Sequence, residues 1–456
     1  MSDTIAAIAT GRSVSAIGVI RMSGGDAIAI ADKVFRATDG IKLESAASRK
    51  LHYGELVGAD GKLIDLVLCT ISHGPSSYTG EDTAEFQCHG SPLVMSEILR
   101  LLFSLGARQA SAGEFTKRAF LNGRMDLVQA EAVIDLIEAE TTAAAQNAAG
   151  QLRGAVGVRL EPVYAALVDI IAHFHAVIDY PDEDIDEFEM QGYLDTLDGA
   201  GKELERLLST HERGRVLRLG VPTAIIGRPN TGKSSLLNAL LGYERAIVTD
   251  IPGTTRDTIE EKLMLGGIAL RLIDTAGLRR ADDKIEKLGV ERTLSALGDA
   301  GLVFLVLDGS IPLQDGDYEA IRSIAPGVPK LAVINKSDLP SALEPDMLAK
   351  MGFNCCCVSA QTGEGLDSLS AKVSELLPQL EMPPSGEIIT NERQADALSR
   401  ARSSINLAAC AITASVTPDA VVTDIEAALA AIGEVTGKTM REDVVLRIFE
   451  RFCVGK

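Results

Sequence analysis

The sequence predicts a protein of several domains: an α+β domain, an all-α helical domain and a P-loop domain with a mostly parallel sheet. Three features indicate this. Short apolar runs punctuated by Gly and Ser fill residues 1 to about 120, Ala-rich helical segments follow, and from about residue 217 buried-strand runs alternate with helices. A chain of 456 residues is long enough for roughly two to four domains.

The amino-terminal part is expected to be a compact α+β domain over residues 1–120. Strand-like runs lie at 16–22, 63–71 and 82–90, and the segment 91–107 has a helical pattern. Gly and Ser residues separate these runs, as they do between the short elements of a compact domain.

A helical texture follows from about Met125. The stretch 126–156 is Ala-rich, lacks proline and repeats apolar residues at helical spacing, and a second helical run at 161–180 ends before Pro181. The acidic run 182–189 is interpreted as a solvated segment rather than a metal site, and His173 and His175 as packed or surface residues rather than ligands.

The third texture is typical of a parallel sheet with crossover helices. Its strand-like runs are "TAIIG", "LRLID", "LVFLVLD", "KLAVIN" and "CCCVSA". Helices return after the linker "EMPPSGE", which suggests that the α/β domain is inserted into a helical domain. The predicted division is an α+β domain at 1–120, a first helical segment at 121–216, the inserted domain at 217–379 and a second helical segment at 380–456.

Composition restricts the kinds of binding partner and the cellular compartment that we expect for the protein. The net charge of −20, from 44 basic and 64 acidic residues, excludes a surface that is basic throughout, so any nucleic-acid contact needs a local patch or a basic partner. The seven cysteines include no C-x-x-C pair, which favours a reducing compartment. The amino terminus does not read as a signal peptide and no apolar run spans a bilayer, so we expect a cytoplasmic protein without a membrane partner.

The segment "GRPNTGKSS", residues 227–235, fits the phosphate-binding pattern G-x-x-x-x-G-K-[ST] between a strand and a helix. Gly227 and Gly232 allow backbone N–H groups to close around phosphates at a helix N-terminus. Lys233 reaches the β- and γ-phosphates, and the Ser234 hydroxyl is a Mg²⁺ ligand.

Three further motifs identify the nucleotide as GTP. "DTAG" at 274–277 follows a strand and is placed to hold Mg²⁺ through water and to sense the γ-phosphate. "NKSD" at 335–338 offers the Asp338 carboxylate to guanine N1–H and its exocyclic amine, which adenine cannot match. "SAQTGEG", from Ser359, is the second base-contacting loop.

The loop "TDIPGTTRD", 249–257, lies where a mobile switch belongs, and Thr255 is the natural second Mg²⁺ ligand. Leu278 follows "DTAG" where many such proteins have a glutamine that orients the attacking water, so another group must do this. The predicted GTP contacts are Asn230, Thr231, Gly232, Lys233, Ser234, Ser235, Thr249, Asp250, Ile251, Pro252, Gly253, Thr254, Thr255, Asp274, Thr275, Ala276, Gly277, Asn335, Lys336, Asp338, Ser359 and Ala360.

Together with "GVIRMSG", "SYTGEDTAEFQCHG", "GEFTKRAFLNGRMDLVQAEAV" and the terminal "FCVGK", these motifs make the sequence resemble the MnmE (TrmE) tRNA-modification GTPases along essentially its whole length. The resemblance implies that a K⁺ ion replaces an arginine finger, with Asn230, Thr249, Ile251 and Thr254 as its matching ligands. It also implies that Glu286 orients the water. Without it, Glu286 reads as a surface carboxylate.

The resemblance further implies that the amino-terminal domain is similar to tetrahydrofolate-binding modules, dimerises, and binds 5-formyltetrahydrofolate or a related one-carbon donor. The matching contacts are Arg21, Glu85, Arg124 and Lys456. Arginine and lysine suit the carboxylates of a folate tail, and glutamate suits the N–H donors of its pterin ring. Arg124 departs from the family, which often has lysine there, so this contact differs in geometry.

Cys453, four residues from the end, has three interpretations. A prenylation box is disfavoured because Gly455 is not aliphatic and no polybasic stretch precedes it, which also argues against a membrane-attached GTPase. The resemblance implies a catalytic role for Cys453 in the modification chemistry, and burial against a helix is the alternative.

The function that the resemblance implies is K⁺-dependent GTP hydrolysis coupled to modification of C5 of the wobble uridine, position 34, of certain tRNAs. The product is a (carboxymethyl)aminomethyluridine. The implied partners are a second copy of the chain, an FAD-containing MnmG-like protein that forms a heterotetramer with it, and tRNA. GTP hydrolysis would drive G-domain dimerisation. The alternative is a regulatory GTP switch in ribosome or RNA assembly, which the nucleotide motifs would serve equally well.

Overall fold

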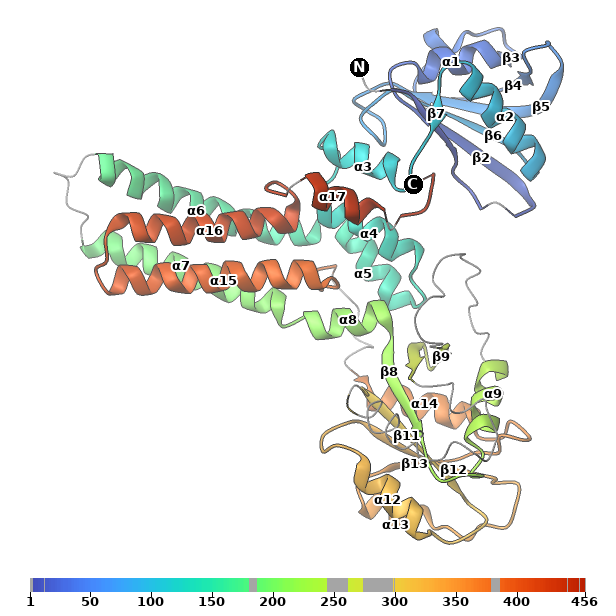
Figure 1. Ribbon diagram of the computed structural model, residues 1–456, viewed down its shortest axis with the longest axis vertical. Coiled ribbons are helices and arrows are strands. Elements are labelled where there is room, and N and C mark those ends of the chain that lie inside the picture. The colour runs from blue at the N-terminus through green and yellow to red at the C-terminus, as the bar shows by residue number, and fades with distance from the viewer. Residues whose placement is uncertain are drawn as a thin grey trace. The chain divides into compact units, whose positions relative to one another are not determined.

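The computed structural model describes residues 3–11, 13–179, 187–243, 261–273, 298, 300–378, 386–440, 442–450 and 452–455 (Figure 1). The chain divides into two compact units, which are considered separately here. Unit 1 comprises residues 1–134, 152–198 and 400–456, and unit 2 comprises 135–151 and 199–399. Unit 2 therefore holds the predicted inserted domain together with short helical segments on both sides of it.

Unit 1 begins with a seven-stranded sheet in the order β3-β4-β5-β6-β2-β1-β7. Strands β1 and β7 pair in parallel, and the other neighbouring strands pair antiparallel. The strands are β1 (Ile5–Ile8), β2 (Ser15–Ser23), β3 (Phe35–Ala37), β4 (Leu51–Val57), β5 (Leu63–Ser72), β6 (Thr83–Gly90) and β7 (Arg108–Gln109).

The helices α1 (Ala27–Val34) and α2 (Pro92–Ser104) pack on one face of this sheet and bury its core. Alternate residues of the strands, such as Ile20 and Phe86, point into that core. The short helix η1 (Leu43–Ser45) adds Leu43 to it. On the opposite face, large apolar side chains including Tyr53 stay about half exposed, at 50% for Tyr53. On this opposite face α3 (Glu114–Leu121) packs its Phe115 against Ile5 and Ala7 of β1, whereas the surface of β4 and β5 stays open.

Helices make up the rest of unit 1. The long helix α6 packs against α16, and α17 contacts α3 (Figure 1). The boundary between the units falls within the helices α4, α7 and α15 and near the end of α5. The bounds are α3 (Glu114–Leu121), α4 (Leu127–Ile137), α5 (Thr142–Leu152), α6 (Ala155–Asp179), α7 (Glu187–Leu208), α15 (Glu392–Thr413), α16 (Pro418–Thr436) and α17 (Glu442–Phe449).

Unit 2 is built around a six-stranded sheet in the order β13-β12-β11-β8-β10-β9, parallel except for the antiparallel hairpin of β9 and β10. Helix α8 leads directly into β8. Apolar cores lie on both faces of the sheet, as a doubly covered parallel sheet requires. The elements are α8 (His211–Leu219), β8 (Val221–Ile226), α9 (Lys233–Tyr243), β9 (Glu261–Leu265), β10 (Ile268–Leu272), β11 (Leu302–Asp308), α12 (Asp315–Ser323), β12 (Lys330–Asn335), α13 (Pro345–Lys350), β13 (Asn354–Cys357) and α14 (Leu366–Leu376).

The predicted mixture of α+β, helical and mostly parallel α/β structure is confirmed. The helical stretch 126–156, however, is interrupted between α4 and α5, because the Thr141 hydroxyl accepts the N–H of Ala144 at 3.0 Å and caps a new helix start. His173 packs its ring against Tyr193, at 5.3 Å between centroids, as the packed interpretation predicts. In the described part of the chain, no helix is both long and apolar enough to cross a bilayer.

Candidate active site

The phosphate-binding loop lies between β8 and α9, and its backbone geometry requires glycine at two positions. Gly227 has φ 143°, and a Cβ there would lie 2.2 Å from the carbonyl oxygen of Val306. Gly232 has φ 92°, and a Cβ there would lie 2.1 Å from Asn335 Nδ2. Asn230 is also left-handed, with φ 63°. The loop therefore takes a shape that other residues resist, with its backbone ending on the N-terminus of α9.

Lys233 closes this loop. Its ammonium donates to the carbonyl oxygens of Gly227 at 2.8 Å and Arg228 at 2.7 Å. Burial lowers the pKa of the Lys233 ammonium. The side chain is thus held over the loop by two backbone carbonyl oxygens.

The predicted base-binding loops follow β12, which pairs with β11, and β13, which pairs with β12. Asn335 connects them to the phosphate loop: its Nδ2 donates to the Thr231 carbonyl and its Oδ1 accepts the N–H of Ala360, both at 3.0 Å. The Ser359 hydroxyl donates to Asp338 Oδ1 at 2.6 Å. The carboxyl ends of parallel strands thus bring three separate motifs together, at the edge where α/β sheets bind ligands.

An ion pair supports the lysine of "NKSD". Lys336 Nζ lies 2.6 Å from Asp308 Oδ2, at the end of β11. Burial acts to raise the Asp308 pKa, but the hydrogen bonds from Lys336 and Ser310 outweigh it and leave the pKa lowered. Lys336 itself has φ 65°, so both its backbone and its charge are fixed beside the base-binding loops.

Several predicted residues lie outside the described part of the chain. These are the switch residues Thr249, Asp250, Ile251, Pro252, Gly253, Thr254 and Thr255, the "DTAG" residues Asp274, Thr275, Ala276 and Gly277, together with Glu286 and Lys456. Ser234 and Ser235 lie in the first turn of α9, and Ser235 is exposed. Among the described residues, no cluster of three or more His, Cys, Asp or Glu side chains is placed to hold a metal ion.

Two of the predicted folate contacts meet in unit 1. Arg21 on β2 and Glu85 on β6 are direct cross-strand partners, and Arg21 Nε donates to Glu85 Oε1 at 2.6 Å. The Arg21 guanidinium also lies 5.5 Å from the ring centroid of Tyr78, a cation–π distance. The Tyr78 hydroxyl is 2.9 Å from Thr116 Oγ1. Arginine, carboxylate and an aromatic ring therefore share one partly exposed site.

Arg124 and the described part of the carboxyl-terminal tail lie against the same domain. The Arg124 stem packs by Gly80, where an added Cβ would lie 3.3 Å from Arg124 Cγ. In the carboxyl-terminal tail, Val454 forms a β-bridge with Ala112, and Gly455 fits against Ile8, whose carbonyl oxygen a Cβ would approach to 2.2 Å. Cys453 is exposed, so the alternative that it is buried against a helix is wrong.

Comparison with known proteins places the chain in one family. Residues 4–124 match the family model "GTP-binding protein TrmE N-terminus" and residues 127–453 match "MnmE helical domain". A protein named tRNA modification GTPase MnmE, from Symbiobacterium thermophilum, is 44% identical over 100% of this chain and 99% of its own length. The protein of that name from Clostridioides difficile is 41% identical over 100% of both chains. This chain belongs to the MnmE family.

Among solved structures, the G domain of the T. maritima FeoB iron transporter matches 34% of the MnmE-family chain and 96% of its own at 30% identity. The TM-score of 0.26 is too low to add to the fold described above. Family membership therefore rests on the full-length relatives and on the two family models.

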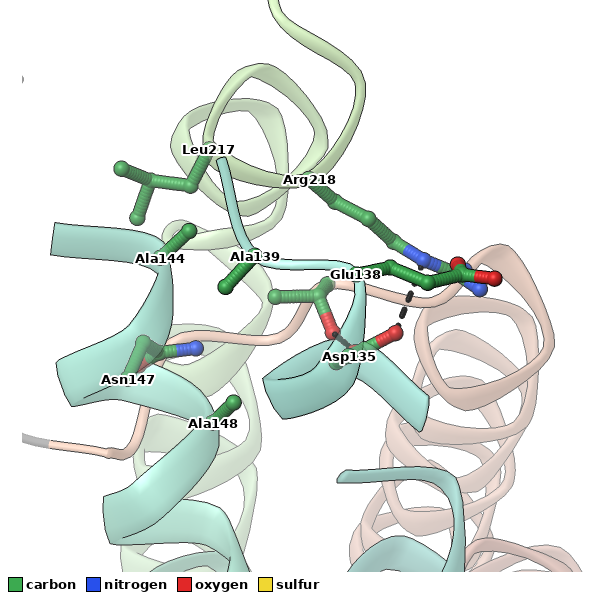
Figure 2. A pocket seen from close by; sticks show the side chains of 9 residues that line it. Asp135, Glu138, Ala139, Ala144, Asn147, Ala148, Leu217 and Arg218 are labelled. Atoms are coloured by element: carbon green, nitrogen blue, oxygen red, sulfur yellow. Dashed lines mark hydrogen bonds and ion pairs between the residues drawn. The ribbon is translucent and has the colours of Figure 1, made fainter. Parts of the chain in front are cut away.

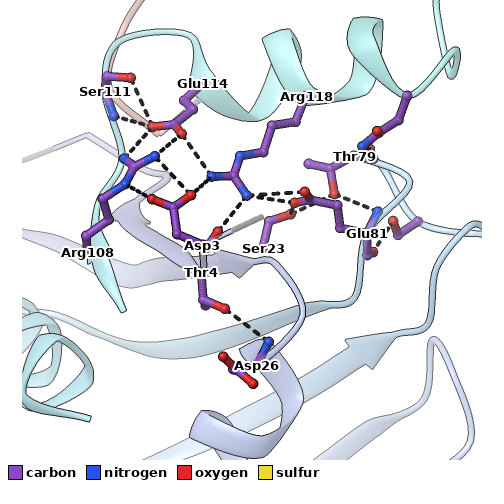
Figure 3. Close-up of polar contacts among 12 residues, drawn as sticks. Asp3, Thr4, Ser23, Asp26, Thr79, Glu81, Arg108, Ser111, Glu114 and Arg118 are labelled. Carbon is purple, nitrogen blue, oxygen red and sulfur yellow. Dashed lines mark hydrogen bonds and ion pairs between the residues drawn. The ribbon is translucent and has the colours of Figure 1, made fainter. Parts of the chain in front are cut away.

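An ion network joins Asp3, Glu81 and helix α3 of this MnmE-family chain (Figure 3). Arg118, only 8% exposed, pairs with Asp3 at 2.8 Å and with Glu81 and Glu114, both at 3.0 Å. Burial acts to raise the Glu114 pKa, but hydrogen bonds from Arg108, Ser111 and Arg118 outweigh it and lower the pKa to about 2. The network holds the loop that carries Tyr78 and Glu81 against α3.

A second polar cluster joins α8 to the helical segments of unit 2 (Figure 2). Arg218 Nε lies 3.0 Å from Asp135 Oδ1, and the Thr390 hydroxyl donates to Asp135 Oδ2 at 3.0 Å. The hollow beside them, about 30 Å³, suits a single water rather than a nucleotide. The buried Asn147 Oδ1 at its wall has no hydrogen-bond partner among the described residues. The polar contacts around this pocket hold α8 against the segments that carry Asp135 and Thr390.

Sequence reasoning missed several residues around these sites. Tyr78, Asp308 and Arg228 were not singled out, although each contacts a predicted site residue or belongs to a site loop. Asp308 carried a usable signal, because a carboxylate that directly ends a buried strand lies at the ligand edge of a parallel sheet. Tyr78 and Arg228 lie within quoted motifs, but their partners are distant in sequence.

Proposed function

We propose that this chain is a GTP hydrolase that acts in tRNA modification. The observation that carries the proposal is the double hydrogen bond of Asn335, at 3.0 Å to each of two loops, which joins the phosphate loop to the guanine-binding loops. The full-length relatives named tRNA modification GTPase MnmE support the reaction class. Asp338, held by Ser359, supports guanine as the base.

For the hydrolysis itself, we propose Mg²⁺ on Ser234 and Thr255 and K⁺ on Asn230, Thr249, Ile251 and Thr254. Asn230 is exposed on the loop, where its amide oxygen is a suitable ligand for a hard cation. When bound, these cations offset the negative charge that grows on the phosphates in the transition state. We assign the orientation of the attacking water to Glu286, because Leu278 cannot hold one.

The test of the hydrolytic proposal is GTP turnover by the full chain in K⁺ and in Na⁺, for the wild type and for Glu286→Ala. We expect turnover to rise in K⁺ and to fall at least about a hundredfold in Glu286→Ala, with GTP affinity near normal. Equal rates in both salts would remove the K⁺ role. A large loss of GTP binding in Glu286→Ala would make that residue structural.

In the amino-terminal domain, we propose a site for a formyl-tetrahydrofolate type of one-carbon donor, formed by Arg21, Glu85, Arg124 and Lys456. The pairing of Arg21 with Glu85 and the neighbouring Tyr78 ring support it, since a folate presents carboxylates, N–H donors and a flat ring. The contact of Gly455 with Ile8 supports an approach of the tail to this domain.

We further propose that the modified position is C5 of the wobble uridine of certain tRNAs, with a flavoprotein of the MnmG type supplying redox chemistry through FAD. The exposure of Cys453 supports access of a substrate to its thiol. Cys453→Ser should abolish tRNA modification and leave GTP hydrolysis intact. Full modification by this variant would exclude the thiol from the chemistry.

For assembly, we propose a cytoplasmic homodimer that joins the flavoprotein in a heterotetramer. The open surface of β4 and β5 supports self-association, because Leu51, Tyr53 and Leu66 lie on it at 52%, 50% and 42% exposure. We also propose the division of the chain into domains at 1–120, 121–216, 217–379 and 380–456.

A further inference from the structure

Arg228, which follows Gly227 in the phosphate loop, is anchored on the neighbouring helix α12. Its Nη1 donates to Gln314 Oε1 at 2.6 Å, and its Nε lies 2.8 Å from Asp317 Oδ2. Asp317 Oδ2 also accepts the N–H of Gln314 at 2.9 Å, which fixes the start of the helix. The guanidinium is therefore committed to α12.

The backbone of the same residue closes the loop. The Arg228 carbonyl accepts from Lys233 Nζ at 2.7 Å and from the Thr231 hydroxyl at 3.0 Å. Thr231 in turn receives Asn335 Nδ2 on its own carbonyl. Arg228 thus contacts α12 with its side chain and Lys233 with its backbone carbonyl. Through Thr231 it is also linked to Asn335.

The packing around Arg228 is close. An added Cβ on Gly316, within α12, would lie 2.8 Å from Arg228 Cδ and 3.1 Å from its Cγ. Glycine inside a helix is destabilising by about 1 kcal/mol relative to alanine, so its presence here needs a reason such as this contact. The Arg228 stem occupies the space that a side chain at 316 would need.

The charges at this contact are mostly buried. The Asp317 side chain is 3% exposed and that of Arg228 is 18% exposed. Asp317 Oδ1 and Arg228 Nε each lack a hydrogen-bond partner among the described residues. The two side chains are therefore joined by charge, through the 2.8 Å ion pair, and the hydrogen bond of the guanidinium goes to Gln314. Removing one partner of such a buried pair destabilises the folded protein strongly, because the other charge stays buried without compensation.

We propose that Arg228 is a positioning residue for the nucleotide: by pairing with Gln314 and Asp317 it holds the first half of the phosphate loop against α12 in the shape that receives phosphates. The inference rests on the proposed binding of GTP. A preorganised loop loses less conformational entropy on binding, so the pairing contributes to nucleotide affinity.

The test is equilibrium binding of GDP and GTP to the full chain, with kcat and KM for GTP, in four variants. Arg228→Ala should raise both dissociation constants about tenfold or more while kcat at saturating GTP stays within about twofold, since bound nucleotide orders the loop again. Arg228→Lys, which keeps the charge without the fork, should recover part of the affinity. Gly316→Ala should weaken binding in the same direction, because its methyl group would displace the Arg228 stem. Arg322→Ala, an arginine at the other end of α12, is the matched control and should change nothing.

The double variant Arg228→Ala, Asp317→Ala separates positioning from stability, because it leaves no unpaired buried carboxylate. If positioning is the role, its nucleotide affinity stays as low as that of Arg228→Ala. Wild-type affinity in either variant would overturn the inference. Failure of the wild-type chain itself to bind GDP and GTP would refute the proposed function instead.

Discussion

The proposed selection of guanine depends on one carboxylate, that of Asp338, which accepts a hydrogen bond from Ser359 at 2.6 Å. Replacing Asp338 with Asn turns one acceptor into a donor, so guanine N1–H and the exocyclic amine lose a partner. We expect GTP affinity to fall about a hundredfold or more, and affinity for xanthosine triphosphate to rise. Competition between the two nucleotides for the Asp338→Asn variant measures both effects. Unchanged GTP affinity would contradict the assignment of Asp338 to the base.

Glu114 makes the stability of unit 1 depend on pH. Its pKa is lowered from 4.5 to about 2 in the folded chain, so its contribution is fully present above pH 4.5 and is lost as the pH falls toward 2. Glu114→Gln should therefore be less stable than the wild type at pH 7, and the difference should shrink on acidification. Urea unfolding of both proteins across this range is the measurement. A difference that is constant with pH would show that the ion network does not depend on the charge of Glu114.

At the scale of elements, α8 is held to the 388–390 segment by close backbone contact. A Cβ on Gly214 would lie 1.9 Å from the Ile389 carbonyl oxygen, whereas one on Gly192 of α7 would meet nothing within 4 Å. Gly214→Ala should lower the free energy of unfolding by about 1–3 kcal/mol. Gly192→Ala should leave it unchanged or raise it by up to about 1 kcal/mol. Chemical denaturation compares the two, and equal effects would mean that the backbone contact at Gly214 is not tight.

Elements with a strong local signal were predictable from the sequence. The strand runs 302–308 and 330–335 coincide with β11 and β12 because such continuous apolar segments suit strands buried on both faces. The break between α4 and α5, where Thr141 caps a new helix start, was not foreseen. The ion pair beside it, between Glu140 and Lys262 on β9, a strand that was itself missed, was not foreseen either. Such contacts join residues far apart in the chain and leave no periodic trace.

The candidate site shows the same contrast between local signals, which the sequence reveals, and contacts between distant segments, which it does not. The phosphate loop was predictable because its requirements lie within one short segment. Gly227 and Gly232 meet the needs of the backbone, and Lys233 supplies the charge. The pairing of Arg228 with Asp317 and of Lys336 with Asp308 joins segments separated in sequence, so only the fold reveals them. Arg21 and Glu85 were chosen through family resemblance, and their cross-strand register now gives that pairing a physical basis.

At the scale of the whole molecule, we expect the two units to serve one reaction. Unit 2 would bind the nucleotide, and the amino-terminal domain and tail in unit 1 would take part in the proposed chemistry. Lys233→Ala removes the phosphate-binding ammonium, and Cys453→Ser removes the exposed thiol of the other unit. We expect each variant alone to abolish tRNA modification, although only the first should impair GTP binding. An active variant of either kind would separate the two units in function.

The most direct measurement is mass spectrometry of wobble-uridine nucleosides in tRNA from cells that lack this chain and from the same cells supplied with wild type or Lys233→Ala. The account predicts that the C5-modified uridines disappear without the chain, return with the wild type, and stay absent with the variant. Unchanged modified nucleosides in the cells that lack the chain would contradict it, and would favour a regulatory GTP switch.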